Sequence, residues 1–156
     1  MWLNPQSWSV ISGFGTKEQQ EKAMDSVYRE LNTPYGAMVM YPPYVKHGFP
    51  GALMQCFNKC TKENAGIFTH NNAWIICAAA YAGEGDQAFK YYSEIAPAFT
   101  EETSDIHKTE PYVYGQMIGG KDAGADIGKQ GDNFGQGKNS WLTGTAAWNM
   151  VAISQY

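Results

Sequence analysis

The stretch Asn72-Ala-Trp-Ile-Ile-Cys-Ala-Ala-Ala-Tyr-Ala82 contains no charged residue and is followed by Gly83. Its length and composition predict a helix, and the glycine predicts where that helix stops. A helix that is apolar on all sides must be covered on all sides. The stretch therefore predicts a buried helix at the centre of a helical protein.

The flanking segments predict helices of two kinds. Thr16 and Gln19 have the spacing of a capping box, and the helix that they begin extends to Leu31 with one apolar stripe and a polar outer face. Residues 86–96 form a second amphipathic segment, which stops at Pro97. Residues 143–156 are again apolar and helical. Residues 119–137 are rich in glycine and predict a long loop.

This alternation of amphipathic and wholly apolar helices is expected of two concentric helical layers. Strand-like alternation of polar and apolar residues is nearly absent, so the predicted class is all-α, with inner and outer helices alternating. Such a small number of helices cannot enclose two uncharged ones. We therefore expect the chain to be part of something larger, or to be covered by a partner.

Composition excludes several kinds of partner. The net charge of −4 argues against binding to nucleic acid or to an anionic membrane. The chain has neither a long apolar run nor the pattern of a signal peptide, and Cys77 lies in an apolar stretch, as expected of a reduced core thiol. We expect a cytoplasmic protein. Ten Tyr, seven Phe and five Trp suit a carbohydrate site, but composition alone favours the alternative, an aromatic-rich core.

The most interpretable candidate site is Thr143-Gly144-Thr145, where a loop enters an apolar helix. Free backbone N–H groups and the positive end of the helix dipole make such a terminus an anion site. The alternative is that a threonine only caps the helix. His70, at the start of the uncharged helix, either contacts an anion or is a core histidine bonded to a backbone carbonyl.

The sequence predicts neither a metal site nor a general acid. Cys56, Cys60 and His70 supply three candidate ligands, and no fourth is paired with them. Glu63 and Glu110 are the best-placed acids, but either can be a structural carboxylate that accepts hydrogen bonds. No segment matches a phosphate loop, a zinc motif or a nucleophile elbow.

Four segments in order carry a resemblance to a known family: NPQSW (4–8), KENAGIFTHNNAW (62–74), EPYVYGQMIGGKDA (110–123) and KNSWLTGTAAWNMVAISQ (138–155). Together they resemble glycoside hydrolase family 94, the cellobiose and chitobiose phosphorylases. The resemblance covers essentially the whole chain. It implies that residues 1–156 are the C-terminal portion of an (α/α)6 catalytic barrel, which they leave incomplete.

The resemblance also implies a reaction and a site. Inorganic phosphate, a co-substrate rather than a cofactor, attacks the anomeric carbon with inversion while a protonated aspartate donates to the departing oxygen. His70, Thr143 and Gly144 match positions that bind phosphate, and Lys62 and Gln116 match positions that contact the sugars. Residues 1–156 match neither the stretch with the general acid nor the phosphate-binding arginine, so we expect no catalytic residue in this chain and no turnover by the chain alone.

The matching segments look closest to cellobiose phosphorylases, which implies conversion of cellobiose and phosphate to glucose 1-phosphate and glucose. Chitobiose, cellodextrin and laminaribiose phosphorylases stay open, as does a non-catalytic helical remnant that binds sugar or phosphate. The expected partners are a small β-linked gluco-oligosaccharide, phosphate, the rest of the parent polypeptide and a second copy in a homodimer.

Overall fold

The computed structural model describes residues 1–45, 56–126 and 129–156, except for the side chain of Thr143. Its elements are α1 (Leu3–Ile11), α2 (Lys17–Glu30), β1 (Ile67–Phe68), α4 (Thr69–Tyr81), α5 (Gly85–Ile95), the 3₁₀ turns η1 (Pro97–Phe99) and η2 (Glu101–Thr103), α6 (Ser104–His107), β2 (Gly115–Ile118), β3 (Gly137–Ser140) and α7 (Thr143–Gln155).

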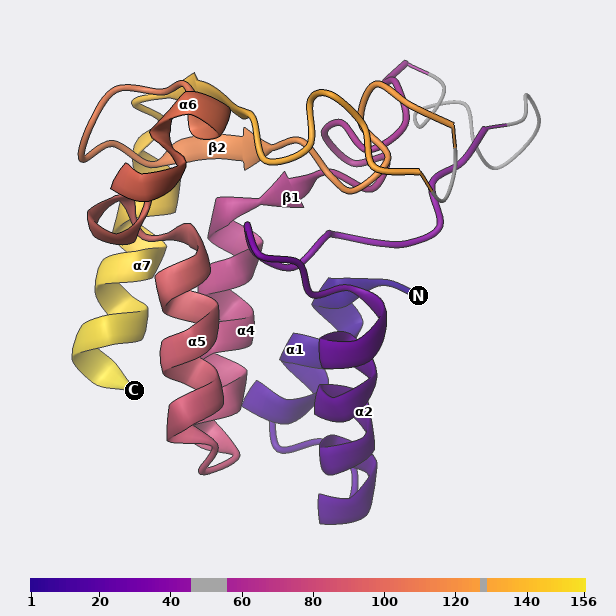
Figure 1. Ribbon diagram of the computed structural model, residues 1–156. Helices are drawn as coiled ribbons and strands as arrows, with labels where there is room; N and C mark the ends of the chain where they lie inside the picture. Colours follow the sequence, from indigo (N-terminus) through magenta and orange to yellow (C-terminus); the bar gives the residue numbers. More distant parts are fainter. Residues whose placement is uncertain (46–55, 127–128) are drawn as a thin grey trace.

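The uncharged helix α4 lies at the centre of the molecule. It packs against α1, α5 and α7 (Figure 1). Nine of its 13 residues are buried, whereas α2 buries only Met24 and Val27 among 14. The predicted contrast between an enclosed helix and an outward-facing one is confirmed.

The helices run in two directions. In Figure 1, α1, α4 and α7 start at the end of the molecule that carries the strands, and α2 and α5 run back toward it. α2 packs against α1, and α5 packs against α4. The N-terminal ends of α4 and α7 therefore lie at the same end of the molecule.

The predicted all-α class is wrong in part, because β1, β2 and β3 form a three-stranded antiparallel sheet in that order. Phe68 pairs with Met117, and Met117 pairs with Lys138. The strands are only two to four residues long, which is too short for alternation to show in the sequence. The predicted barrel stays a prediction.

Two helix starts also differ from expectation. α1 begins at Leu3 and spans residues for which the sequence analysis predicts no helix. α4 begins at Thr69, three residues before the uncharged stretch, because β1 leads directly into it. The start of α2 agrees with the sequence: Thr16 N–H donates to Gln19 Oε1 at 2.8 Å, and Gln19 N–H donates to Thr16 Oγ1 at 3.3 Å.

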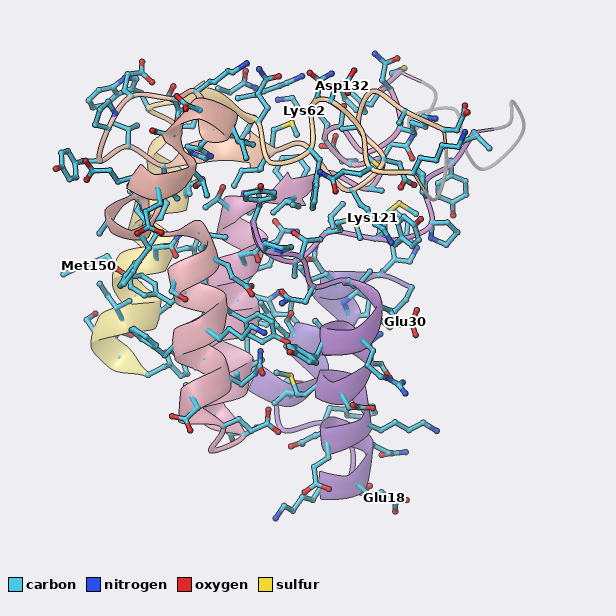
Figure 2. All side chains as sticks on the ribbon, in the orientation of Figure 1. Glu18, Glu30, Lys62, Lys121, Asp132 and Met150 are labelled. Atoms are coloured by element: carbon cyan, nitrogen blue, oxygen red, sulfur yellow. The ribbon has the colours of Figure 1, made fainter. Side chains whose placement is uncertain are left out.

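The outer surfaces of α2 and α7 differ in character. Figure 2 shows Glu18 and Glu30 extending from α2, where both are exposed. α7 instead exposes apolar side chains, including Met150 at 62% and Ile153 at 54%. That another part of a larger protein covers this face stays a prediction. No helix within the described residues is long and apolar enough to cross a membrane.

Asn72 joins the first turn of α4 to the segment after α2. Its side chain is fully buried. Its Oδ1 accepts from Ala37 N–H at 2.7 Å, and its Nδ2 donates to the carbonyls of Ala37 and Phe68 at 3.0 and 2.8 Å. One amide thus pairs both the N–H and the C=O of Ala37 and adds a hydrogen bond to the Phe68 carbonyl at the start of α4.

We expect Asn72→Ala to lower the free energy of unfolding by about 2–4 kcal/mol, because it leaves buried backbone groups unpaired. Urea denaturation measures this change. Asn58→Ala is the matched control, since Asn58 is exposed. Equal stability of the two variants would contradict the role given to Asn72.

Candidate functional site

His70 occupies the first turn of α4, immediately after β1. It is half-buried, and its ring lies 5.2 Å from the Phe68 ring and 5.4 Å from the Trp74 ring, between centroids. Burial lowers the pKa of His70, and the nearby carboxylate of Glu63 opposes that shift. The imidazole is therefore neutral near pH 7, where it offers one N–H donor.

The pairing of β1 with β2 brings Gln116 to the start of α4. His70 and Gln116 line an open pocket of about 270 Å³ together with the start of α7. The lining residues from that helix and the turn before it are Leu142, Gly144, Thr145 and Trp148. The fold thus brings together His70, Gln116 and Gly144, which come from three separate segments of the sequence.

The N-cap position of α7 is occupied by Leu142, which makes no side-chain cap hydrogen bond. Neither threonine of the Thr143-Gly144-Thr145 segment is therefore the N-cap residue itself. Thr143 is the first residue of the helix, but its side chain lies outside the described residues, so its predicted contact stays a prediction.

Neither the described neighbours of Gly144 nor its backbone conformation requires a glycine at this position. A Cβ built there meets nothing within 4 Å, and its φ lies outside the left-handed region. Its backbone N–H belongs to the first turn, where the helix dipole favours an anion. Gly144 also lines the pocket that contains His70.

Lys62 and Gln116 form a pair at the edge of this pocket. Lys62 Nζ donates to Gln116 Oε1 at 2.7 Å, and Asn139 Nδ2 donates to the same oxygen at 3.1 Å. Figure 2 shows Lys62 at the end of the molecule that carries the loops. With Oε1 engaged by two donors, the amide NH₂ of Gln116 is the group left to contact a ligand.

Three tryptophans pack beside the pocket. Trp8 of α1, Trp74 of α4 and Trp148 of α7 have ring centroids 5.5–6.4 Å apart. Trp148 also lines the pocket, although the sequence reasoning did not single it out. Its spacing of four residues from Gly144 places both on one helix face, and this was the signal available in the sequence.

Both candidate acids, Glu63 and Glu110, are exposed. The hydrogen bond from the Ser140 hydroxyl, a backbone hydrogen bond and the hydrogen bond from Trp141 hold the pKa of Glu110 below its usual value, so its carboxylate is ionised near neutral pH. That neither residue is the general acid stays a prediction. Within the described residues no three His, Cys, Asp or Glu side chains are grouped as metal ligands.

The catalytic-domain model of the glycosyl hydrolase 94 superfamily matches residues 1–156. The chain belongs to this superfamily. It is 31% identical over its whole length to a solabiose phosphorylase of Paenibacillus borealis, and 31% identical over 99% of its length to an N,N'-diacetylchitobiose phosphorylase of Vibrio furnissii. It is also 30% identical, over 92% of its length, to the cyclic beta-(1,2)-glucan synthase NdvB of Rhizobium meliloti (strain 1021).

These relatives are much longer than the chain. It spans 19% of the solabiose phosphorylase, 18% of the N,N'-diacetylchitobiose phosphorylase and 5% of the glucan synthase. The comparison therefore establishes the family of this segment.

The substitution Gly144→Ala should affect phosphate binding without lowering the stability of the fold. We expect it to leave stability unchanged, or to raise it by up to about 1 kcal/mol, because the Cβ has room and alanine favours a helix. Phosphate binding should weaken if the backbone N–H of Gly144 contacts the anion, because a Cβ hinders the close approach of a ligand to the backbone. Thermal unfolding and calorimetric titration with phosphate measure the two effects.

Gly85→Ala is the matched control, since a Cβ at Gly85, the first residue of α5, also meets nothing within 4 Å. Its phosphate affinity should equal that of the unmodified protein. Unchanged phosphate affinity in Gly144→Ala would contradict the assignment of Gly144.

Proposed function

We propose that this chain is the C-terminal portion of the catalytic domain of an inverting disaccharide phosphorylase, and that its pocket binds the attacking phosphate. The observation that carries the proposal is the convergence of His70 with the N-terminus of α7. Such a terminus favours an anion. Family membership and the relatives named as phosphorylases support it.

In the proposed reaction a phosphate oxygen forms a bond to the anomeric carbon while the glycosidic C–O bond breaks. The departing oxygen takes a proton from a general acid, which we place outside this chain. The neutral imidazole of His70 donates to one phosphate oxygen. The Gly144 N–H and the Thr143 hydroxyl donate to the others. These donors fix the nucleophile in line and offset its loss of water.

Lys62 and Gln116 are proposed to bind the sugar. They lie beside the phosphate pocket and are already paired with each other. An ammonium group and an amide are suitable partners for sugar hydroxyls. Because the pair forms before a ligand arrives, little side-chain freedom is lost on binding.

Cellobiose is our proposed substrate, with glucose 1-phosphate and glucose as products. The relatives are named for other disaccharides, so N,N'-diacetylchitobiose, cellodextrin, laminaribiose and solabiose belong in the same test. A cytoplasmic location, a homodimer and independence from cofactors are further parts of the proposal. The alternative is a non-catalytic remnant that binds sugar or phosphate.

Incubation of the intact protein with each disaccharide, with and without phosphate, tests the proposal. We expect a sugar 1-phosphate from one of them, only when phosphate is present, and none from residues 1–156 alone. Loss of acid catalysis alone costs roughly 10²–10⁴-fold in rate. Hydrolysis independent of phosphate, or robust turnover by the 156-residue chain, would contradict it.

A further inference from the structure

We propose that Glu110 is a positioning residue that holds the phosphate-binding start of α7 in place. The inference rests on the proposed function. Glu110 lies in the segment between α6 and β2, and its carboxylate accepts hydrogen bonds from the Ser140 hydroxyl and from Trp141 Nε1, the latter at 3.2 Å. Ser140 ends β3, Trp141 follows it, and Leu142 occupies the N-cap position of α7.

The turn that Glu110 holds is strained. Asn139 and Trp141 both have left-handed backbones, with φ of 55° and 69°. This conformation is uncommon for residues other than glycine, and for a bulky residue it persists only where the surroundings hold it. The side chain of Trp141 is 70% exposed, so burial does little to hold it.

Three hydrogen bonds, to Gln116 and to Glu110, restrain this turn. Asn139 donates to Gln116, which ties the turn to β2. The carboxylate of Glu110 ties the next two residues to the loop before β2. Together they fix the direction in which the chain enters α7, and hence where the first-turn N–H groups point.

The charge of Glu110 argues that it does not contact phosphate directly. It is an anion near neutral pH, so direct contact with phosphate would be repulsive. It also lines a different cavity, of about 370 Å³, with His107 and Thr109. The His70 pocket is lined by other residues. Glu110 thus acts on the phosphate site through Ser140 and Trp141.

Steady-state kinetics of Glu110→Ala and Glu110→Gln in the intact protein test this role. We expect Glu110→Ala to raise the KM for phosphate by about five- to twentyfold, while the KM for the disaccharide and the shape of the pH profile stay unchanged. Glu110→Gln should restore part of the loss, because its amide oxygen still accepts one hydrogen bond. Glu102→Ala, at an exposed glutamate of η2, is the matched control.

Two kinetic results would overturn the inference. One is a fall in kcat with loss of the alkaline limb of the pH profile and an unchanged KM for phosphate, which would make Glu110 the acid. The other is a phosphate KM equal to that of Glu102→Ala. If Glu110→Ala fails to fold, Ser140→Ala removes one of the two hydrogen bonds that the Glu110 carboxylate accepts, and it should also raise the KM for phosphate.

Hydrogen exchange separates this inference from the proposed function. We expect Glu110→Ala to speed amide exchange in residues 141–147 of the intact protein, whether or not the protein catalyses phosphorolysis. If the unmodified protein shows no phosphorolysis but exchange rises, the proposed function fails and the restraint on the turn stands. Unchanged exchange in this segment overturns the restraint itself.

Discussion

The requirement to enclose one uncharged helix organises the whole structure. α4 carries no charged side chain and buries nine of its 13 residues, so neighbours must cover it on several sides. α1, α5 and α7 provide that cover. Because α4 and α7 run in the same direction (Figure 1), their N-terminal ends lie together. The pocket between His70 and Gly144 is a consequence of this packing.

Because α4 is enclosed, the backbone N–H and C=O groups buried near its start need hydrogen-bond partners within the protein. The backbone of the segment that passes over this end is buried with it, and the fully buried amide of Asn72 meets that need through Ala37 and Phe68. β1 leads directly into α4 and pairs with β2. The short sheet is what brings Gln116, and through it Lys62, to the pocket.

Much of the helical arrangement is predictable from local sequence. The capping box at Thr16 and the uncharged stretch around Ile75 are strong local signals, and both correspond to helices in the structure. The strands are not predictable in this way. Gly115 and Gly137 begin strands of four residues that are stabilised by pairing with distant segments. The local strand propensity of such short segments does not predict this pairing.

The candidate site likewise combines features that local sequence predicts with features that depend on tertiary packing. Thr143-Gly144 is recognisable locally as a loop entering an apolar helix, but its proximity to His70 depends on how α4 and α7 pack. The contacts of Glu110 could not be predicted for the same reason. Its sequence context is equally consistent with an acid or an acceptor, and the hydrogen bonds that it accepts from Ser140 and Trp141 depend on the tertiary structure.

The most direct test of the proposed phosphate site is an NMR pH titration of the His70 ring in the intact protein, with and without phosphate. Burial lowers the pKa of His70 in the free protein, and it also lowers that of His107, which serves as the internal control. A bound anion stabilises the imidazolium. We predict that saturating phosphate raises the pKa of His70 and leaves that of His107 unchanged. An unchanged His70 pKa under saturating phosphate, or equal shifts of both rings, would contradict the account.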